Sequence, residues 1–389
     1  MAELFQEQLQ ALRARSLHRK LREIGTPQGA EVEIVGRQLL NFSSNDYLGL
    51  AADPILRQAA IAAIEEFGVG AGASRLISGT QSPHVALEVA LAKWKRAPAA
   101  ICFSSGYAAA VGVLPALASK QDVVILDKLS HASLIDGARL SGATLRVFPH
   151  NHLGKLESHL EWAQREHPEA RIVVVTESVF SMDGDRAPLR ELVDLKERFG
   201  AHLLLDEAHA VGVLGPHGRG AAAELGLEAK IDVQMGTLSK SLGVSGGYIC
   251  GSRSLIDWLI NRARSFIFST APPPALAAAA TAAIRFLLSD DGEARRKLLW
   301  RRIVQFKKLL PDRAAAFGQP GAAIIPWMVG DEEQALELAK ALRQEGFFVP
   351  AIRYPTVARG AARLRITISA AHSALQVASL GDAIARLSV

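Results

Sequence analysis

Short apolar runs alternate with helical stretches through the middle of the chain, and this alternation restricts the possible folds more than any other feature of the sequence. The predicted strands are residues 99–103, 122–126, 144–148, 171–177 and 202–206. The predicted helices are residues 55–67, 82–94, 107–118, 157–166 and 189–199. Repeated strand–helix alternation is typical of an α/β fold, in which helices sandwich a mostly parallel sheet. Such sheets bind ligands at the carboxyl ends of their strands.

The two ends of the chain follow other patterns. We predict one amphipathic, basic helix over residues 1–24, a hairpin around Gly36 and an irregular polar loop over residues 41–50. After the triple proline at 272–274, a helical region to residue 310 and later strands at 322–329, 347–352 and 364–368 indicate a smaller α+β part. We therefore expect an N-terminal helix and hairpin (1–49), a large domain (50–271) and a small C-terminal domain (272–389).

The length and composition exclude several classes of protein. A chain of 389 residues is long enough for one large domain and a lesser one. The net charge of +5 permits anionic substrates but does not demand nucleic acid. No run of about 18 uncharged apolar residues is present, so we expect no membrane span, and the polar start predicts no signal peptide. Cys102 and Cys250 lie in apolar runs and are predicted to be free thiols, which favours a cytoplasmic location.

Lys240 lies in a run of small residues, Gly236-Thr237-Leu238-Ser239-Lys240-Ser241-Leu242-Gly243. An amine in such a pocket is partly desolvated, which lowers its pKa and makes it a nucleophile for a carbonyl group. The neighbouring hydroxyls can donate hydrogen bonds to a phosphate, and the glycines let the backbone approach a flat ligand. The segment therefore suits a lysine that carries pyridoxal phosphate (PLP) as a Schiff base. A surface lysine in a flexible turn is the alternative that this segment alone leaves open.

Four other motifs compete for the function, and each lacks its required context. Asp206-Glu207-Ala208-His209 has the letters of a helicase motif, but no Gly-x-x-x-x-Gly-Lys-Ser/Thr phosphate loop accompanies it. Gly68–Ala73 matches a loose dinucleotide-binding loop, but a helix rather than a strand precedes it. Gly243–Gly247 matches a serine-hydrolase elbow without the apolar strand that should precede it. No Cys or acid cluster completes a zinc site at His150–His152, so we predict no metal.

Polar residues at the ends of the predicted strands form a second signal. Asp206 ends a predicted strand, Ser178 and His131 each follow one, and His209 lies three residues after Asp206. A buried carboxylate at Asp206 needs a cationic partner, such as a protonated pyridine nitrogen. Ser105-Gly106-Tyr107 opens a helix whose backbone N–H groups would bind a phosphate. Each residue alone also has a structural explanation, as a helix cap or a core histidine, but together they indicate one ligand site.

With these residues in place, the sequence resembles the α-oxoamine synthase family of fold-type I PLP enzymes from about Leu9 to the C-terminus. The motifs that carry the resemblance are Asn41-Phe-Ser-Ser-Asn-Asp-Tyr-Leu-Gly-Leu50, Leu129-Ser-His-Ala-Ser133, Thr176-Glu-Ser-Val-Phe-Ser-Met-Asp-Gly184, Asp206-Glu-Ala-His209, Gly236-Thr-Leu-Ser-Lys240, Ile352-Arg-Tyr-Pro-Thr-Val357 and Arg363-Leu-Arg365. Within that family the chain is most similar to the biotin-pathway member, which joins L-alanine to pimeloyl-CoA.

The resemblance implies roles for individual residues. Catalytic roles fall to Lys240, which would carry the cofactor, to Asp206, which would pair with its pyridine nitrogen, and to His131, which would stack on its ring. The implied cofactor-binding residues are Gly106, Tyr107, Ser178, Asp206, His209, Thr237, Lys240 and Thr270, the last reaching the site of a neighbouring subunit. The implied substrate-binding residues are Arg22, Asn45, His131, Thr356 and Arg365, with Arg365 clamping the carboxylate of the amino acid.

The reaction implied by the resemblance is a decarboxylative condensation of an amino acid with an acyl-CoA, most closely of L-alanine with pimeloyl-CoA. It also implies a homodimer with shared active sites and neither a nucleic-acid nor a membrane partner. Among enzymes, a glycine C-acetyltransferase, another α-oxoamine synthase or a transaminase is the alternative. A PLP-binding protein without catalytic activity is the alternative from a different class.

Overall fold

The computed structural model describes residues 1–310, 317 and 321–387, and it contains two compact units. The small unit comprises Met1–Gly49, Met182–Gly184 and Lys297–Val389, and the large unit comprises Leu50–Ser181 and Asp185–Arg296. Residues 272–296 thus group with the large unit. The predicted division into three parts, with boundaries at residues 49 and 271, stays a prediction. Across the described ranges, no helix is both long and apolar enough to cross a membrane.

The large unit is built on a seven-stranded sheet with the order β3-β9-β8-β7-β6-β4-β5. Its strands are β3 (Ala99–Phe103), β4 (Val123–Asp127), β5 (Thr144–Phe148), β6 (Ile172–Glu177), β7 (His202–Asp206), β8 (Val233–Thr237) and β9 (Gly247–Gly251). Only β9 runs antiparallel to both of its neighbours, and the remaining neighbours pair in parallel. The predicted α/β fold with a mostly parallel sheet is confirmed.

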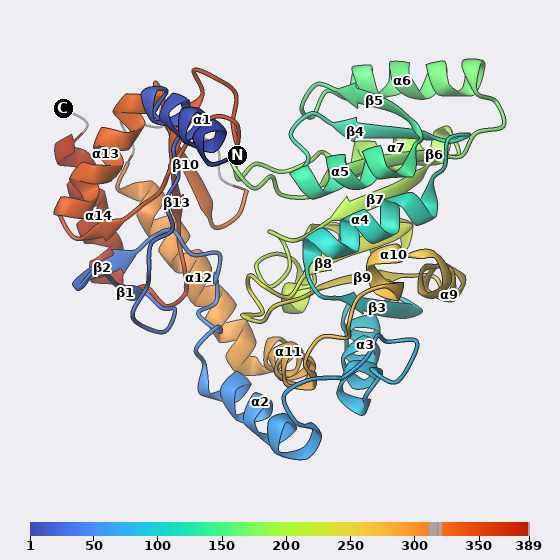
Figure 1. The fold of residues 1–389 in the computed structure, drawn as a ribbon, viewed down its shortest axis with the longest axis horizontal. Helices are drawn as coiled ribbons and strands as arrows, with labels where there is room; N and C mark the ends of the chain where they lie inside the picture. The colour runs from blue at the N-terminus through green and yellow to red at the C-terminus, as the bar shows by residue number, and fades with distance from the viewer. Residues whose placement is uncertain (311–316, 318–320, 388–389) are drawn as a thin grey trace. The chain divides into compact units, whose positions relative to one another are not determined.

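Helices cover this sheet, and Figure 1 shows α4 and α5 lying across its strands. The helices of the large unit are α2 (Pro54–Phe67), α3 (Ser82–Trp94), α4 (Gly106–Leu117), α5 (Ala132–Ser141), α6 (Leu153–Glu166), α7 (Leu189–Arg198), α8 (Ala221–Glu224), α9 (Arg253–Arg262), α10 (Arg264–Ile267) and α11 (Pro274–Leu287), with short 3-10 turns at Pro216–Gly218 and Glu228–Lys230. Most strands consist of consecutive apolar residues, because both faces of each strand are buried. The core between the sheet and α4 includes Val113, Leu126 and Val175.

The small unit holds two three-stranded sheets. In one, β1 (Glu31–Ile34), β2 (Arg37–Asn41) and β11 (Phe347–Phe348) pair in that order, and the predicted hairpin around Gly36 is confirmed. The other has the order β10 (Ile324–Gly330), β13 (Ala362–Thr367), β12 (Ala351–Ile352). The helices are α1 (Ala2–Ala14), α13 (Glu332–Gln344) and α14 (Ala374–Leu387), while α12 (Asp290–Lys308) begins within the large unit.

Two predicted elements were wrong in their extent. The first helix ends at Ala14 rather than near residue 24, because Ser16 adopts a left-handed φ of 55°. The Ser16 N–H then donates to Arg13 O and the Leu17 N–H to Leu12 O, which is a Schellman ending. The predicted strand 347–352 is two short strands, β11 and β12, which pair in different sheets. Pro350 lies between them and has no N–H with which to continue a ladder.

Candidate active site

The predicted site residues of the large unit follow strands that run in the same direction. Their carboxyl ends therefore lie at one edge of the sheet, where α/β proteins bind ligands. His131 follows β4, Ser178 follows β6, Asp206 ends β7 and Thr237 ends β8. The structure brings these residues together through the contacts described next.

Lys240 lies in the turn that joins β8 to β9. The turn is closed by backbone hydrogen bonds from the Leu238 N–H to Gly246 O and from the Gly243 N–H to Lys240 O, both 2.9 Å long. Gly243 has a φ of 70°, and a Cβ atom there would lie 2.6 Å from the backbone nitrogen of Ala51, so only glycine fits. This turn places Lys240 Nζ 2.8 Å from Nε2 of His209.

Asp206 is the buried acid of the site, with 5% of its surface exposed. Its Oδ1 accepts a hydrogen bond of 2.9 Å from the Ala208 N–H. Burial raises the pKa of Asp206, although Lys240 and the Ala208 N–H act in the opposite direction. A buried carboxylate with a raised pKa is stabilised by a further cation, which is what a protonated ring nitrogen supplies.

His131 faces the same acid. Burial lowers the pKa of His131, and the nearby Lys240 lowers it further, while Asp206 raises it. The imidazole is therefore neutral near pH 7, which suits both stacking on a ring and accepting a proton. Its backbone N–H donates to Glu177 Oε1 at 2.6 Å. Ser178 is fully buried, and its backbone N–H donates to Asp206 O at 2.9 Å.

A cradle of hydroxyl and N–H groups lies where β3 and β8 end. Ser105 caps α4 by accepting a hydrogen bond from the Ala108 N–H, so the first turn of this twelve-residue helix begins at Gly106. A Cβ atom at Gly106 would lie 3.6 Å from Thr237 Oγ1, so glycine keeps the space beside that hydroxyl open. Thr237 Oγ1 also lies 2.6 Å from Ser239 Oγ. Helix N-termini and hydroxyls of this kind bind phosphate groups.

These features fit the groups that PLP presents. The lysine amine matches its aldehyde, the buried carboxylate matches its pyridine nitrogen, and the open cradle at Gly106 and Thr237 matches its phosphate. Two predicted cofactor residues form contacts with residues outside this set. Tyr107 is half exposed and donates from its hydroxyl to Asp136 at 2.8 Å, while Thr270 forms a β-bridge with Ser74.

Arg365 and Asn45 belong to the small unit and contact each other. Arg365 Nη2 donates to Asn45 Oδ1 at 3.0 Å, and Nη1 donates to Thr367 Oγ1 at 3.1 Å. Arg365 is 5% exposed, and these hydrogen bonds help to orient its guanidinium group. Such a fork is suited to binding a carboxylate with two hydrogen bonds.

Arg22 and Thr356 lie in a cluster of cations, also in the small unit, which we call the arginine cluster (Arg19, Arg22, Arg343 and Arg353). Arg19 Nη2 donates to Thr356 Oγ1 at 3.1 Å. The guanidinium groups of Arg22 and Arg343 lie 5.9 and 6.0 Å from the ring centre of Phe348. Burial lowers the pKa of Arg353, and Arg19 and Arg22 lower it further. Crowded cations of this kind are stabilised by a bound anion.

Sequence reasoning assigned no role to Glu177, Arg19, Arg343 or Arg353. Glu177 could have been found from the sequence, because it is an acidic residue at the end of the predicted strand 171–177. In the structure it is the register partner of Asp206 on the neighbouring strand. Burial and the neighbouring Asp206 hold the pKa of Glu177 well above its ordinary value. The arginine cluster carried no local signal, since Arg343 and Arg353 are separated from Arg19 and Arg22 by more than 300 residues in the sequence.

The competing motifs have structural explanations. Glu207 pairs with buried Lys95 at 2.6 Å, so this acid of the helicase-like motif is engaged inside the protein. His150 contacts Asp127 and Asp185, and His152 caps α6, while no group of three potential metal ligands occurs within the described ranges.

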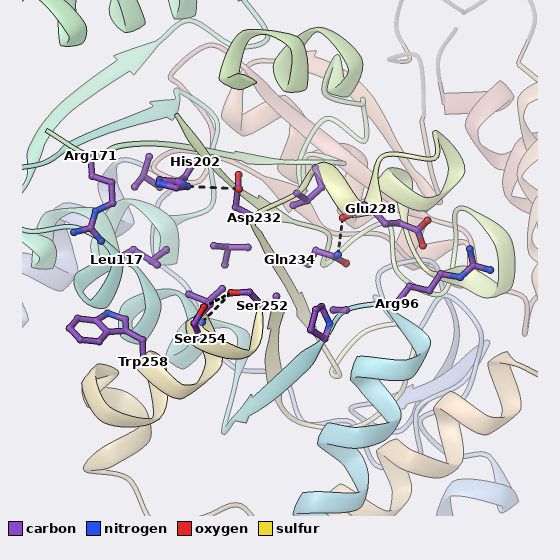
Figure 2. A pocket seen from close by; sticks show the side chains of 18 residues that line it. Arg96, Leu117, Arg171, His202, Glu228, Asp232, Gln234, Ser252, Ser254 and Trp258 are labelled. Atoms are coloured by element: carbon purple, nitrogen blue, oxygen red, sulfur yellow. Dashed lines mark hydrogen bonds and ion pairs between the residues drawn. The ribbon is translucent and has the colours of Figure 1, made fainter. Parts of the chain in front are cut away.

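A separate pocket of about 910 Å³ lies at the amino ends of β6, β7 and β8. Figure 2 shows Arg171, His202 and Trp258 among its lining residues. None of the predicted site residues lines it, so it lies at the opposite edge of the sheet from the candidate active site.

Comparisons with known proteins agree with this geometry. An 8-amino-7-oxononanoate synthase from Geobacter sulfurreducens is 47% identical over 98% of this chain and 96% of its own length. Serine palmitoyltransferase from S. paucimobilis, solved with bound PLP-myriocin aldimine, superposes with a TM-score of 0.91 at 33% identity, covering 97% of this chain and 95% of its own. An 8-amino-7-oxononanoate synthase from Francisella tularensis gives a TM-score of 0.74 at 27% identity, covering 90% and 99%.

These relatives confirm the resemblance to α-oxoamine synthases that the motifs indicated. The family model described as "Aminotransferase class I and II" matches residues 37–384. The match spans both compact units and includes nearly every predicted site residue, the exception being Arg22. The chain therefore belongs to the aminotransferase class I and II family.

Proposed function

We propose that this protein uses PLP to condense L-alanine with pimeloyl-CoA, giving 8-amino-7-oxononanoate, CoA and CO₂ in the pathway to biotin. The observation that carries the proposal is the 45–47% identity to curated 8-amino-7-oxononanoate synthases over nearly the full length of both chains. The lysine, acid and histidines at the carboxyl edge of the sheet are the groups that this chemistry needs.

When bound, PLP supplies an electron sink that stabilises negative charge at the Cα atom of an amino acid. Asp206 keeps the cofactor's ring nitrogen protonated, which maintains this sink. Lys240 Nζ would hold the cofactor, and once the amine of the substrate displaces it, the free lysine amine can take the Cα proton; a positioned base of this kind contributes about 10²–10⁴-fold. His209 lies 2.8 Å from that amine and can share its proton. Ser178 and His209 would bind the ring oxygen, while Gly106, Tyr107 and Thr237 would bind the phosphate.

The two substrates need separate anion sites. Arg365, held by Asn45 and Thr367, binds the carboxylate of alanine and is suited to it because its fork is already oriented. The acyl chain of pimeloyl-CoA ends in a free carboxylate. The arginine cluster supplies cations that can bind it, and Thr356 lies beside them. We assign Arg22 to this carboxylate, with Arg19 orienting Thr356. His131 stacks on the cofactor ring and contacts the acyl substrate.

We further propose that the protein is a cytoplasmic homodimer. Large apolar side chains are exposed through α2, the loop after it and α3: Ile55, Ile61, Ile64, Val69, Leu76, Ile77, Val85 and Val89. Exposed apolar residues gathered in one segment favour a protein interface. The β-bridge between Ser74 and Thr270 joins this segment to Thr270, which would then reach the partner's cofactor. Two buried free thiols, Cys102 and Cys250, suit a reducing compartment.

The deciding experiment offers the purified protein L-alanine or glycine with pimeloyl-CoA or acetyl-CoA and follows CoA release and product mass. We expect the highest kcat/KM for alanine with pimeloyl-CoA. A preference for glycine with acetyl-CoA would make the protein a glycine C-acetyltransferase. Amino transfer without CoA release would make it a transaminase. PLP binding without turnover would identify a non-catalytic binding protein.

A further inference from the structure

Two loops carry proposed cofactor residues, and a third segment forms hydrogen bonds with both of them. The β4–α5 loop runs from Asp127 to His131. The second is a hairpin that begins at Ser178, in which Val179 bridges to Arg186 and the Phe180 N–H donates to Asp185 O at 3.0 Å. The segment between them is the turn after β5, which carries His150.

Asp127 anchors the base of the His131 loop. Its side chain is fully buried. Its Oδ1 accepts hydrogen bonds from the Leu129 N–H at 2.8 Å and from His150 Nδ1 at 3.0 Å, and its Oδ2 accepts one from the Asn151 N–H at 2.8 Å. The other end of the loop is fixed because the His131 N–H donates to Glu177. The carboxylate of Asp127 thus ties the loop directly to the turn at His150.

The same turn holds the hairpin. His150 Nε2 lies 2.8 Å from Asp185 Oδ2, and Asn151 Nδ2 donates to that oxygen at 3.0 Å and to Arg186 O at 3.2 Å. The His150 ring also packs edge-on against Phe180, with centroids 4.3 Å apart. Both ring nitrogens of His150 therefore face carboxylate oxygens. Neutral imidazole has only one N–H, so two such hydrogen bonds require the imidazolium form.

We propose that His150, as an imidazolium between Asp127 and Asp185, is a positioning residue that fixes the His131 loop relative to the Ser178 hairpin. The proposal rests on the proposed function, which gives His131 and Ser178 their contacts with the cofactor. In this proposal, the His131 loop and the Ser178 hairpin each need the contact with His150, in addition to their own strands, to keep their positions. The charge on His150 is needed because a neutral imidazole has a single N–H and cannot donate to both carboxylates at once.

Hydrogen exchange of the full-length protein with PLP tests the link without measuring turnover. We expect His150→Gln to raise amide exchange in both 127–131 and 178–187 by about ten-fold or more, the effect of losing a charge-assisted hydrogen bond. His159→Gln is the matched control, because His159 lies in α6, the helix after this turn, and its ring contacts the backbone oxygen Val147 O rather than a carboxylate. Faster exchange in one loop alone, or in neither, would overturn the proposal. Asp185→Asn tests the same contact if the first variant does not fold.

A double-mutant cycle on cofactor retention separates positioning from simple destabilisation. His150→Gln should speed the loss of PLP from the holoenzyme several-fold in the wild-type background, yet add little in a His131→Ala background, because coupled residues are non-additive. Equal effects in both backgrounds would show that His150 does not act through His131. If exchange couples the two loops as expected while no condensation product forms, the proposed function fails and the link between the loops stands.

Discussion

Lys240 Nζ lies 2.8 Å from His209 Nε2, although the two residues are 31 positions apart in the sequence. The turn after β8 and the turn after β7 deliver them to the same edge of the sheet. The contact sets the candidate nucleophile beside a group that can exchange a proton with it, and close to the buried carboxylate of Asp206.

Lys240→Ala should abolish covalent retention of the cofactor, because it removes the amine proposed to carry it. The purified variant should lack the visible absorbance of the wild type after borohydride treatment and dialysis. Lys128→Ala is the control, since Lys128 is an exposed lysine. If the wild-type protein itself retains no cofactor after borohydride treatment, the assignment of Lys240 is wrong.

Asp206→Asn should bind PLP but lose most turnover. An amide is nearly isosteric but carries no charge, so it cannot keep a ring nitrogen protonated. We expect kcat to fall by about 10²–10⁴-fold, as when a preorganised electrostatic group is removed from an active site. Steady-state kinetics together with the absorbance of bound cofactor measure the two effects separately. A kcat within a few-fold of wild type would leave Asp206 a structural role only.

Arg22→Ala should weaken the use of pimeloyl-CoA more than that of octanoyl-CoA, which lacks the terminal carboxylate. A hydrogen bond to a charged group is worth about 1.5–3 kcal/mol, or about ten- to a hundred-fold in kcat/KM. Arg13→Ala is the matched control, because Arg13 is an exposed arginine in the last turn of α1. Equal losses on both acyl substrates would show that Arg22 acts on folding rather than on the carboxylate.

Ile77→Lys should disrupt the proposed homodimer, because Ile77 is 81% exposed within the apolar segment and a buried charge there would be unpaired. Analytical ultracentrifugation should show a smaller species at micromolar concentration. Val147→Lys places the same charge at a residue of β5 that is 55% exposed, and it should sediment as the wild type does. A wild-type protein that is already monomeric would contradict the dimer.

The free energy of unfolding should fall at alkaline pH, because His150 then loses its proton. Burial lowers the pKa of this residue, but hydrogen bonds to Asp127 and Asp185 outweigh burial and raise it to about 10, from an ordinary 6.5. The stabilisation is therefore complete below pH 6.5 and is lost as the pH rises through about 10. In urea unfolding, the difference between wild type and His150→Gln should be about 1.5–3 kcal/mol near pH 6 and should vanish above pH 10. A difference that does not depend on pH would exclude the charged form.

Much of the large unit was predictable because its signals are local. The strands 99–103, 144–148 and 202–206 and the helix 82–94 were placed with the correct ends, since apolar runs and capping residues are set by near neighbours. The order of the strands along the chain also fixed which polar residues follow them. The sequence therefore predicts His131, Ser178, Asp206 and Lys240 as site residues from local signals.

The tertiary structure alone decided how charges far apart in the sequence meet. Glu177 became the partner of the His131 loop through strand register, and His150 became an imidazolium only because Asp127 and Asp185 reach it from separate segments. Arg22 lies outside the first helix, which ends before Ser16, and it lies near Arg343 and Arg353 in the arginine cluster. A sequence records the type of each side chain, but protonation depends on burial and on which charges surround it, and these arise only when the chain is folded.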